Sequence, residues 1–190
     1  DSAVTIIKEF GMDAYQVIDP TLLLTSNEYD KIADERLENE KYLLLYARRY
    51  NPHMEAYAEK LAAENGWKIV EISLRAKNAE KTNRRMFYEA GVEEFLSLTK
   101  YAECVVTNSL HGTIFAVQYS KPLCVFSREQ CDTKIKELLA LFSLTDHMLV
   151  SGAEDKGNLN DINYEVVHSR IAEARKKSLE FLRMELTSCF

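Results

Sequence analysis

The sequence predicts an α/β fold in which helices cover both faces of a doubly wound parallel sheet. Short apolar runs such as residues 42–46 (YLLLY) recur along the chain and are typical of strands buried on both faces. Segments with helix caps alternate with these runs. The order strand, helix, strand implies right-handed crossovers, and therefore a parallel sheet.

The first crossover is the best defined. After the strand at 42–46, Asn51 is a candidate N-cap, Pro52 suits the first helical position, and Asn65-Gly66 is a stop signal. Residues 67–73 (WKIVEIS) then alternate between apolar and polar, which predicts a second strand. The two strands and the helix between them form one parallel unit.

The same unit repeats with variations along the rest of the chain. Residues 86–90 (MFYEA) are a possible third strand, and Arg84 is placed before this strand, away from any crevice. The expected elements that follow are helix 92–102, strand 103–107, helix 109–119, strand 122–126 and helix 133–142.

The two ends of the chain have different characters. Residues 162–186 combine spaced apolar side chains with abundant charge, which predicts a long amphipathic helix that packs one face. Residues 1–24 contain a helix end, a stop at Gly11 and a strand-like run at 14–18, and are interpreted as a connector from a missing N-terminal half. The charged segment 30–41 predicts a solvated helix at the start of a domain that spans 25–190.

Composition limits the function. The 190 residues carry 24 Lys and Arg against 30 Asp and Glu, a net charge of −6, which argues against a nucleic-acid or anionic-membrane partner. The four cysteines lack metal-ligand spacing and fit a reduced, cytoplasmic setting. No apolar run approaches the ~20 residues that span a bilayer, so no transmembrane segment is expected.

Ligands of open parallel sheets bind beyond the carboxyl ends of the strands, so the loops after residues 46, 73, 107 and 126 are the places to look for a site. These loops carry basic and polar side chains: Arg48, Arg49, Arg75, Asn108, Ser109, His111, Ser127 and Arg128. Each arginine alone is better explained by a solvated surface charge. Together they favour an anion site.

The turn Asn108–Gly112 is the strongest local signal. A helix that begins near Ser109, capped by Asn108 or Ser109, presents free N–H groups and a partial positive charge to an anion. Gly112 would remove a side chain that blocks close approach. His111 then lies in the first turn, where it either faces the ligand or packs over the sheet edge; spacing alone does not decide between the two.

Several motifs, in order, resemble the polysaccharide pyruvyl transferase family. They are VIDPTLLLTSNEYDKI, YLLLYARR, GVEEFLSLTKYAECVVTNSLHGTIFAVQYSKPLCVF and RKKSLEFLRMEL. The resemblance covers most of residues 15–187. It implies two Rossmann-like halves, similar to the two-domain B type of glycosyltransferases, of which this chain would be the second, donor-side domain.

The resemblance implies transfer of a pyruvyl group from phosphoenolpyruvate to sugar hydroxyls of a cell-surface polysaccharide or its precursor, as in exopolysaccharide biosynthesis. His111 would be the general acid/base, and substrate would be bound by the motif residues Asn108, Ser109, Gly112 and Thr113 with the basic side chains of the crevice. No cofactor or metal is required; the partners would be the donor, a sugar or polysaccharide acceptor and the missing N-terminal half. Two alternatives stay open: a nucleotide-sugar glycosyltransferase-like domain, or a non-catalytic binding module of the same fold.

Overall fold

A computed structural model describes residues 2–73, 83–88, 90–127, 132–149 and 161–188. Its centre is a six-stranded parallel sheet with the order β3-β2-β1-β4-β5-β6. The strands are β1 (Tyr42–Tyr46), β2 (Lys68–Ile72), β3 (Arg84–Phe87), β4 (Cys104–Thr107), β5 (Leu123–Phe126) and β6 (Met148–Leu149). This is the doubly wound order, so the predicted fold class is confirmed.

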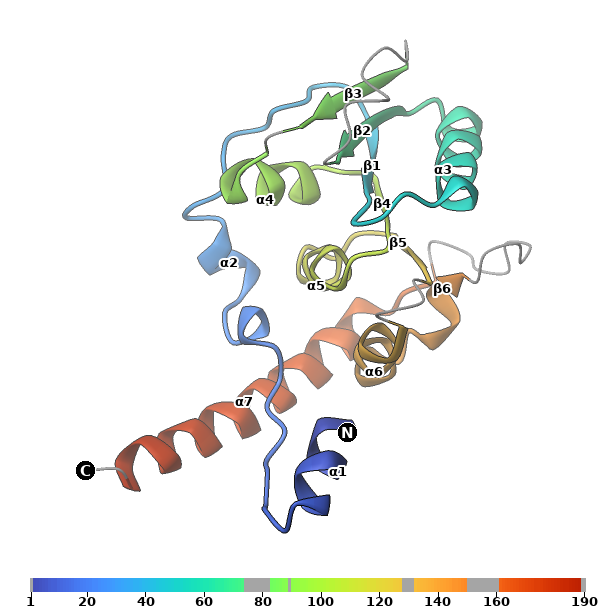
Figure 1. Cartoon of the computed structure of the whole chain (residues 1–190). Coiled ribbons are helices and arrows are strands. Elements are labelled where there is room, and N and C mark those ends of the chain that lie inside the picture. Colours follow the sequence, from blue (N-terminus) through green and yellow to red (C-terminus); the bar gives the residue numbers. More distant parts are fainter. Residues whose placement is uncertain (1, 74–82, 89, 128–131, 150–160, 189–190) are drawn as a thin grey trace.

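Helices lie on both faces of the sheet (Figure 1). They are α1 (Ser2–Glu9), α2 (Ser26–Tyr29), α3 (Pro52–Asn65), α4 (Val92–Lys100), α5 (Leu110–Gln118), α6 (Asp132–Phe142) and α7 (Tyr164–Ser188), with 3-10 turns η1 (Pro20–Leu22) and η3 (Thr145–His147). The predicted helices at 51–66, 92–102, 109–119, 133–142 and 162–186 are therefore confirmed. Their caps explain the boundaries: Asn51 accepts from the N–H of His53 and Met54, and Gly66 ends α3 with φ +66°.

The strands alternate their side chains between two apolar clusters. Leu44 and Val105 point to the face covered by α4, α5, α6 and α7. Leu43 and Val106 point to the opposite face, where α3 packs. Every residue of β4 and β5 is buried, which is why both strands are almost wholly apolar.

The second strand differs from its expected alternation. Residues 69–72 are all buried, including Glu71 at 3% exposed. Its carboxylate is 2.6 Å from the guanidinium of Arg84, which also contacts Glu55 and Glu59 on α3. Arg84 was expected to precede the third strand, but it is the first residue of β3, which spans 84–87 rather than 86–90. Because Arg84 neutralises Glu71 inside the protein, β2 can bury this polar side chain instead of turning it toward solvent.

The charged segment 30–41 is not a helix. Helix α2 ends at Tyr29, and turns and irregular chain lead from there to β1. Glu38 in this segment is 5% exposed and pairs with Lys68 on β2 and Arg85 on β3, each at 3.2 Å. These ion pairs hold the segment against the edge of the sheet. A helix surrounded by solvent would not place Glu38 next to both strands.

The N-terminal segment packs on α7 without forming a strand. Residues 14–18, predicted to be strand-like, have no ladder partner in the described part of the chain. Instead the ring of Tyr15 stacks on Phe181 with centroids 4.3 Å apart, and the Ile18 N–H donates to Ser178 Oγ at 3.1 Å. Side-chain contacts from α7 have taken the place of a neighbouring strand.

Candidate functional site

The topological switch point lies between β1 and β4, because β2 and β5 continue the sheet in opposite directions from this pair. Tyr46 and Thr107 are register partners at the carboxyl ends of these strands. The Thr107 hydroxyl donates to the Tyr46 carbonyl at 2.7 Å. The segments that follow, the loop at 47–50 and residues 108–109 before α5, therefore start side by side.

Asn108 joins these two loops. Its Oδ1 accepts from the Arg48 N–H at 2.9 Å, and its Nδ2 donates to the Arg49 carbonyl at 2.7 Å. Asn108 is 1% exposed, so its own amide is almost completely removed from water, although its partners on the Arg48–Arg49 loop are exposed. Through these two bonds Asn108 positions the Arg48–Arg49 loop beside the start of α5.

Ser109 is the N-cap of α5, which settles the choice between Asn108 and Ser109. Its Oγ accepts from the Gly112 N–H at 3.3 Å, and its carbonyl accepts from the Thr113 hydroxyl at 3.0 Å. Thr113 is fully buried. Both residues build the helix start rather than face solvent. Backbone N–H groups of Leu110 and His111 have no acceptor among the described residues and remain available at the positive end of the helix.

Gly112 serves a different purpose from the one expected. A Cβ at this position would point into the core, 2.9 Å from Tyr46 Cδ1 and closer still to Thr107 Oγ1. The missing side chain therefore lets α5 pack tightly on the ends of β1 and β4. It does not open a path for an anion.

His111 is exposed, unlike Asn108, Ser109, Gly112 and Thr113 of the motif, which are buried. Its side chain is 56% exposed, and Nε2 lies 4.0 Å from Asp19 Oδ2. Asp19 is itself fixed, because Oδ1 accepts from the Thr21 N–H at 2.9 Å and from the Thr21 hydroxyl at 2.6 Å. The structure thus pairs an accessible imidazole with an immobilised carboxylate, and places His111 on the side facing solvent rather than in the sheet edge.

Asp19 was not among the residues singled out from the sequence. The Asp-Pro-Thr run does carry a recognisable signal, since Asp before Pro is a good N-cap and Asp19 caps η1. What the local pattern lacks is any indication that this cap meets α5. The contact depends on the segment 18–24, which Gln118 and Arg175 hold through its backbone carbonyls.

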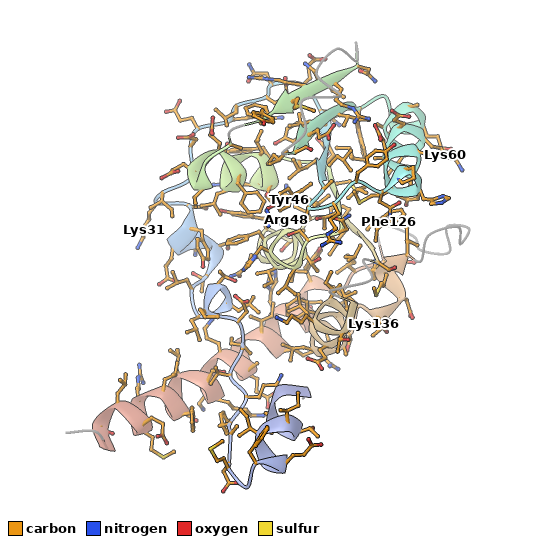
Figure 2. The ribbon with its side chains drawn as sticks, viewed as in Figure 1. Lys31, Tyr46, Arg48, Lys60, Phe126 and Lys136 are labelled. Atoms are coloured by element: carbon orange, nitrogen blue, oxygen red, sulfur yellow. The ribbon has the colours of Figure 1, made fainter. Side chains whose placement is uncertain are left out.

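The basic side chains are only partly brought together. Arg48 and Arg49 are exposed at the end of β1, and Figure 2 shows Tyr46 and Arg48 close to the end-on view of α5, with Phe126 nearby at the end of β5. Ser127 follows β5, and its N–H donates to the Leu149 carbonyl at 2.9 Å, which pairs it with β6. Arg75 and Arg128 lie outside the described residues.

The site offers an exposed imidazole next to an aspartate at the start of α5, and two exposed arginines, Arg48 and Arg49, follow β1. Within the described ranges no group of three or more His, Cys, Asp or Glu side chains could hold a metal ion. None of the helices described has the length and apolar character needed to cross a membrane. The thiols of Cys104 and Cys124 are buried within β4 and β5, and burial raises the pKa of Cys104, so that thiol does not resemble an activated nucleophile.

Comparison with known proteins identifies the family of the chain. No curated protein sequence matches the chain. Among solved structures, the chain is similar to E. coli ADP-heptose LPS heptosyltransferase II, with 15% identity and a TM-score of 0.40. The match covers 87% of this chain and 54% of that one, so the chain spans about half the length of that protein. The family model for polysaccharide pyruvyl transferase matches residues 1–130, which include β1 to β5, Asp19 and His111. The chain therefore belongs to the polysaccharide pyruvyl transferase family.

Proposed function

We propose that the protein transfers a pyruvyl group from phosphoenolpyruvate to two hydroxyls of a sugar in a cell-surface polysaccharide or its precursor, forming a pyruvate ketal. The observation that carries the proposal is the exposed His111 at the start of α5, inside the family-matched region and facing Asp19. Asn108, Ser109 and Thr113 of the motif are buried and Leu110 is an apolar, half-buried side chain, so His111 is the polar motif side chain that can reach a reacting group.

The reaction requires a proton donor and cations. Protonation of the methylene carbon C3 turns the enol into an oxocarbenium-like centre at C2, which a sugar hydroxyl attacks. A second hydroxyl then displaces phosphate by attack at C2, and the C2–O bond to phosphate breaks. Of the two hydroxyl protons, one replaces the proton delivered to C3 and the other goes to the departing phosphate, which keeps the bridging oxygen.

His111 is assigned the proton transfer in this scheme. An imidazole can donate to C3 and later accept from an attacking hydroxyl. Asp19 lies where it can orient the ring and balance the positive charge that an imidazolium carries, as the carboxylate of a catalytic triad does. Because Thr21 holds Asp19, the carboxylate is already in place before substrate binds.

The donor is assigned to the switch point. Phosphoenolpyruvate carries a phosphate and a carboxylate, and arginines bind both groups through paired N–H donors. Arg48 and Arg49 stand at the carboxyl edge, and Asn108 holds their backbone beside the α5 N-terminus. The acidic protein, with net charge −6, gives no long-range attraction, so affinity for the donor rests on these short-range groups.

The proposal includes an N-terminal half and a cytoplasmic location. A Rossmann-like half on its own leaves His111 open to water, and a transfer reaction needs its acceptor oriented and water excluded. We therefore expect residues 1–190 alone to fold but not to turn over, and the full-length protein to be active.

The test is acceptor-dependent release of phosphate from phosphoenolpyruvate by the full-length protein. We expect release with phosphoenolpyruvate and no consumption of UDP- or ADP-sugars. Turnover of a nucleotide sugar would favour a glycosyltransferase, and the absence of any turnover or binding would favour a non-catalytic module. Either result would overturn the proposal.

A further inference from the structure

A cleft of about 920 Å³ lies beside the Asp19–His111 pair. Its walls are the N-terminal segment 15–22, the first turns of α5, one face of α6 and the middle of α7. Asp19 and Leu110 line it, and Leu110 is the residue immediately before His111. The volume lies at the upper end of the range for small-molecule sites.

The floor of the cleft is apolar. Leu22, Ile114 and Leu138 line it, and all three belong to the core cluster beneath the sheet. These side chains are supported from behind by α5, α6 and the sheet, so the floor is rigid. A ligand that fits it must present some apolar surface.

The polar side chains of the cleft are balanced in sign. The charged residues that line it are three cations and three carboxylates: Lys134, Arg170, Lys177, Asp19, Glu137 and Glu173. Lys177 and Glu173 form an ion pair at 2.6 Å on α7. Such a lining offers hydrogen-bond donors and acceptors in equal measure but no net charge. It does not suit phosphoenolpyruvate, which carries two anionic groups, and it does suit an uncharged molecule rich in hydroxyls.

An aromatic ring stands at the same cleft. Tyr15 lines it, is 51% exposed, and is held in place by stacking on Phe181. The C–H face of a pyranose packs on such a ring, while its hydroxyls pair with charged side chains around it. Apolar floor, aromatic face and balanced polar rim together are the chemistry of a carbohydrate site.

We infer that this cleft binds the sugar acceptor, an inference that rests on the proposed function for its role in catalysis. His111 then lies between two substrates. The donor side is the β1–β4 edge, where Asn108 holds the Arg48–Arg49 loop, and the acceptor side is the cleft at Asp19 and Leu110. Figure 1 shows α5 between the sheet and the helices α6 and α7, so one helix start serves both sides.

Two alanines on α7 give a matched test. Ala174 lines the cleft and is half-buried, whereas Ala172 is exposed and does not line it. Ala174→Trp should fill the cleft, and Ala172→Trp places the same ring on the same helix outside it. The probes are methyl glucopyranoside, methyl mannopyranoside and methyl galactopyranoside, titrated into the ¹⁵N-labelled full-length protein.

We expect at least one glycoside to shift the amide signals of cleft residues such as Leu110 and Ala174, and the Ala174→Trp variant to lose this response while Ala172→Trp keeps it. In the transfer assay Ala174→Trp should raise the KM for the acceptor at least about tenfold and leave the KM for phosphoenolpyruvate unchanged.

Three results would overturn the inference. They are glycoside shifts that avoid the cleft in wild type, an equal response in both variants, and a change in oligomeric state caused by Ala174→Trp, which would make the cleft a protein interface. Failure of the proposed function is seen separately, because it removes phosphate release from wild type while leaving glycoside binding at the cleft intact.

Discussion

Asp19 Oδ2 lies 4.0 Å from His111 Nε2, and the two side chains come from distant parts of the chain. Asp19 caps η1 through Thr21, and Ser109 caps α5. Two helix starts therefore meet at this pair. Catalytic hydrogen bonds often tighten only when substrate binds, so a separation of this size is compatible with a working acid/base pair.

Asp19→Asn should lower kcat by an order of magnitude or more while the free energy of unfolding stays within about 1 kcal/mol of wild type. Asparagine keeps an oxygen that accepts from the Thr21 N–H, so the cap survives and only the charge facing His111 is lost. Steady-state kinetics should show a change in kcat with little change in the KM for phosphoenolpyruvate. Asp13→Asn, at an exposed position in the same segment, is the control. An unchanged kcat for Asp19→Asn would remove the carboxylate from the mechanism.

Gly112→Val should destabilise the fold by roughly 1–3 kcal/mol, because the new side chain is forced against Thr107 and Tyr46. Urea denaturation of the variant measures this loss. Gly91→Ala is a milder comparison, since its Cβ would meet carboxylate oxygens at the ends of two side chains, Glu93 at 3.3 Å and Glu94 at 3.9 Å. A stable Gly112→Val variant that specifically lost donor binding would restore the expectation that this glycine opens an anion path.

Asn108→Ala should loosen the Arg48–Arg49 loop and cost roughly 1–3 kcal/mol, because it leaves the Arg48 N–H and the Arg49 carbonyl unpaired. Hydrogen exchange of the Arg48 amide should become faster, whereas the amide of Val70 within β2 should keep its protection relative to global unfolding. If the Arg48 amide exchanged at the wild-type rate, Asn108 would not be what holds the loop.

His168 should make the protein less stable in mild acid. Burial lowers its pKa from the ordinary 6.5, with a further contribution from Arg175, so the unfolded chain binds the proton more readily than the folded one. The stability linked to this group is therefore complete above pH 6.5 and is lost as the pH falls below it. His168→Gln, which can still bond Ser120 Oγ, should lose less stability on acidification in urea titrations. Equal losses in variant and wild type would contradict this.

The sequence was most informative where local signals and burial agree. A helix cap depends only on neighbours in the chain, so Asn51 and Gly66 predict the ends of α3 correctly. A strand that is buried on both faces must be apolar throughout, so the apolar runs predict β1, β4 and β5. The predictions of a helix at 30–41 and a strand at 14–18 are wrong because these segments are held by residues far away in the chain. Glu38 pairs with Lys68, and Tyr15 stacks on Phe181. No local pattern encodes such partners.

The site shows the same division. The motif around His111 is visible in the sequence, and the structure agrees that this histidine is exposed at a helix start. Asn108 and Gly112 belong to the same motif but have structural roles: Asn108 is buried and holds a loop, and Gly112 packs against Thr107 and Tyr46. These roles become visible only from the contacts in the structure. Asp19 could not be chosen in advance because its partner lies far away in the chain.

The most direct test of the central claim is phosphate release from phosphoenolpyruvate in the presence of a sugar acceptor, measured for full-length wild type, His111→Ala and His53→Ala. His53 is an exposed histidine in the first turn of α3, on the opposite face of the sheet, and serves as the control. We expect wild type and His53→Ala to release phosphate at the same rate and His111→Ala to be slower by about 10² to 10⁴, with its fold intact. Equal rates for His111→Ala and wild type would contradict the assignment of His111 as the acid/base of pyruvyl transfer.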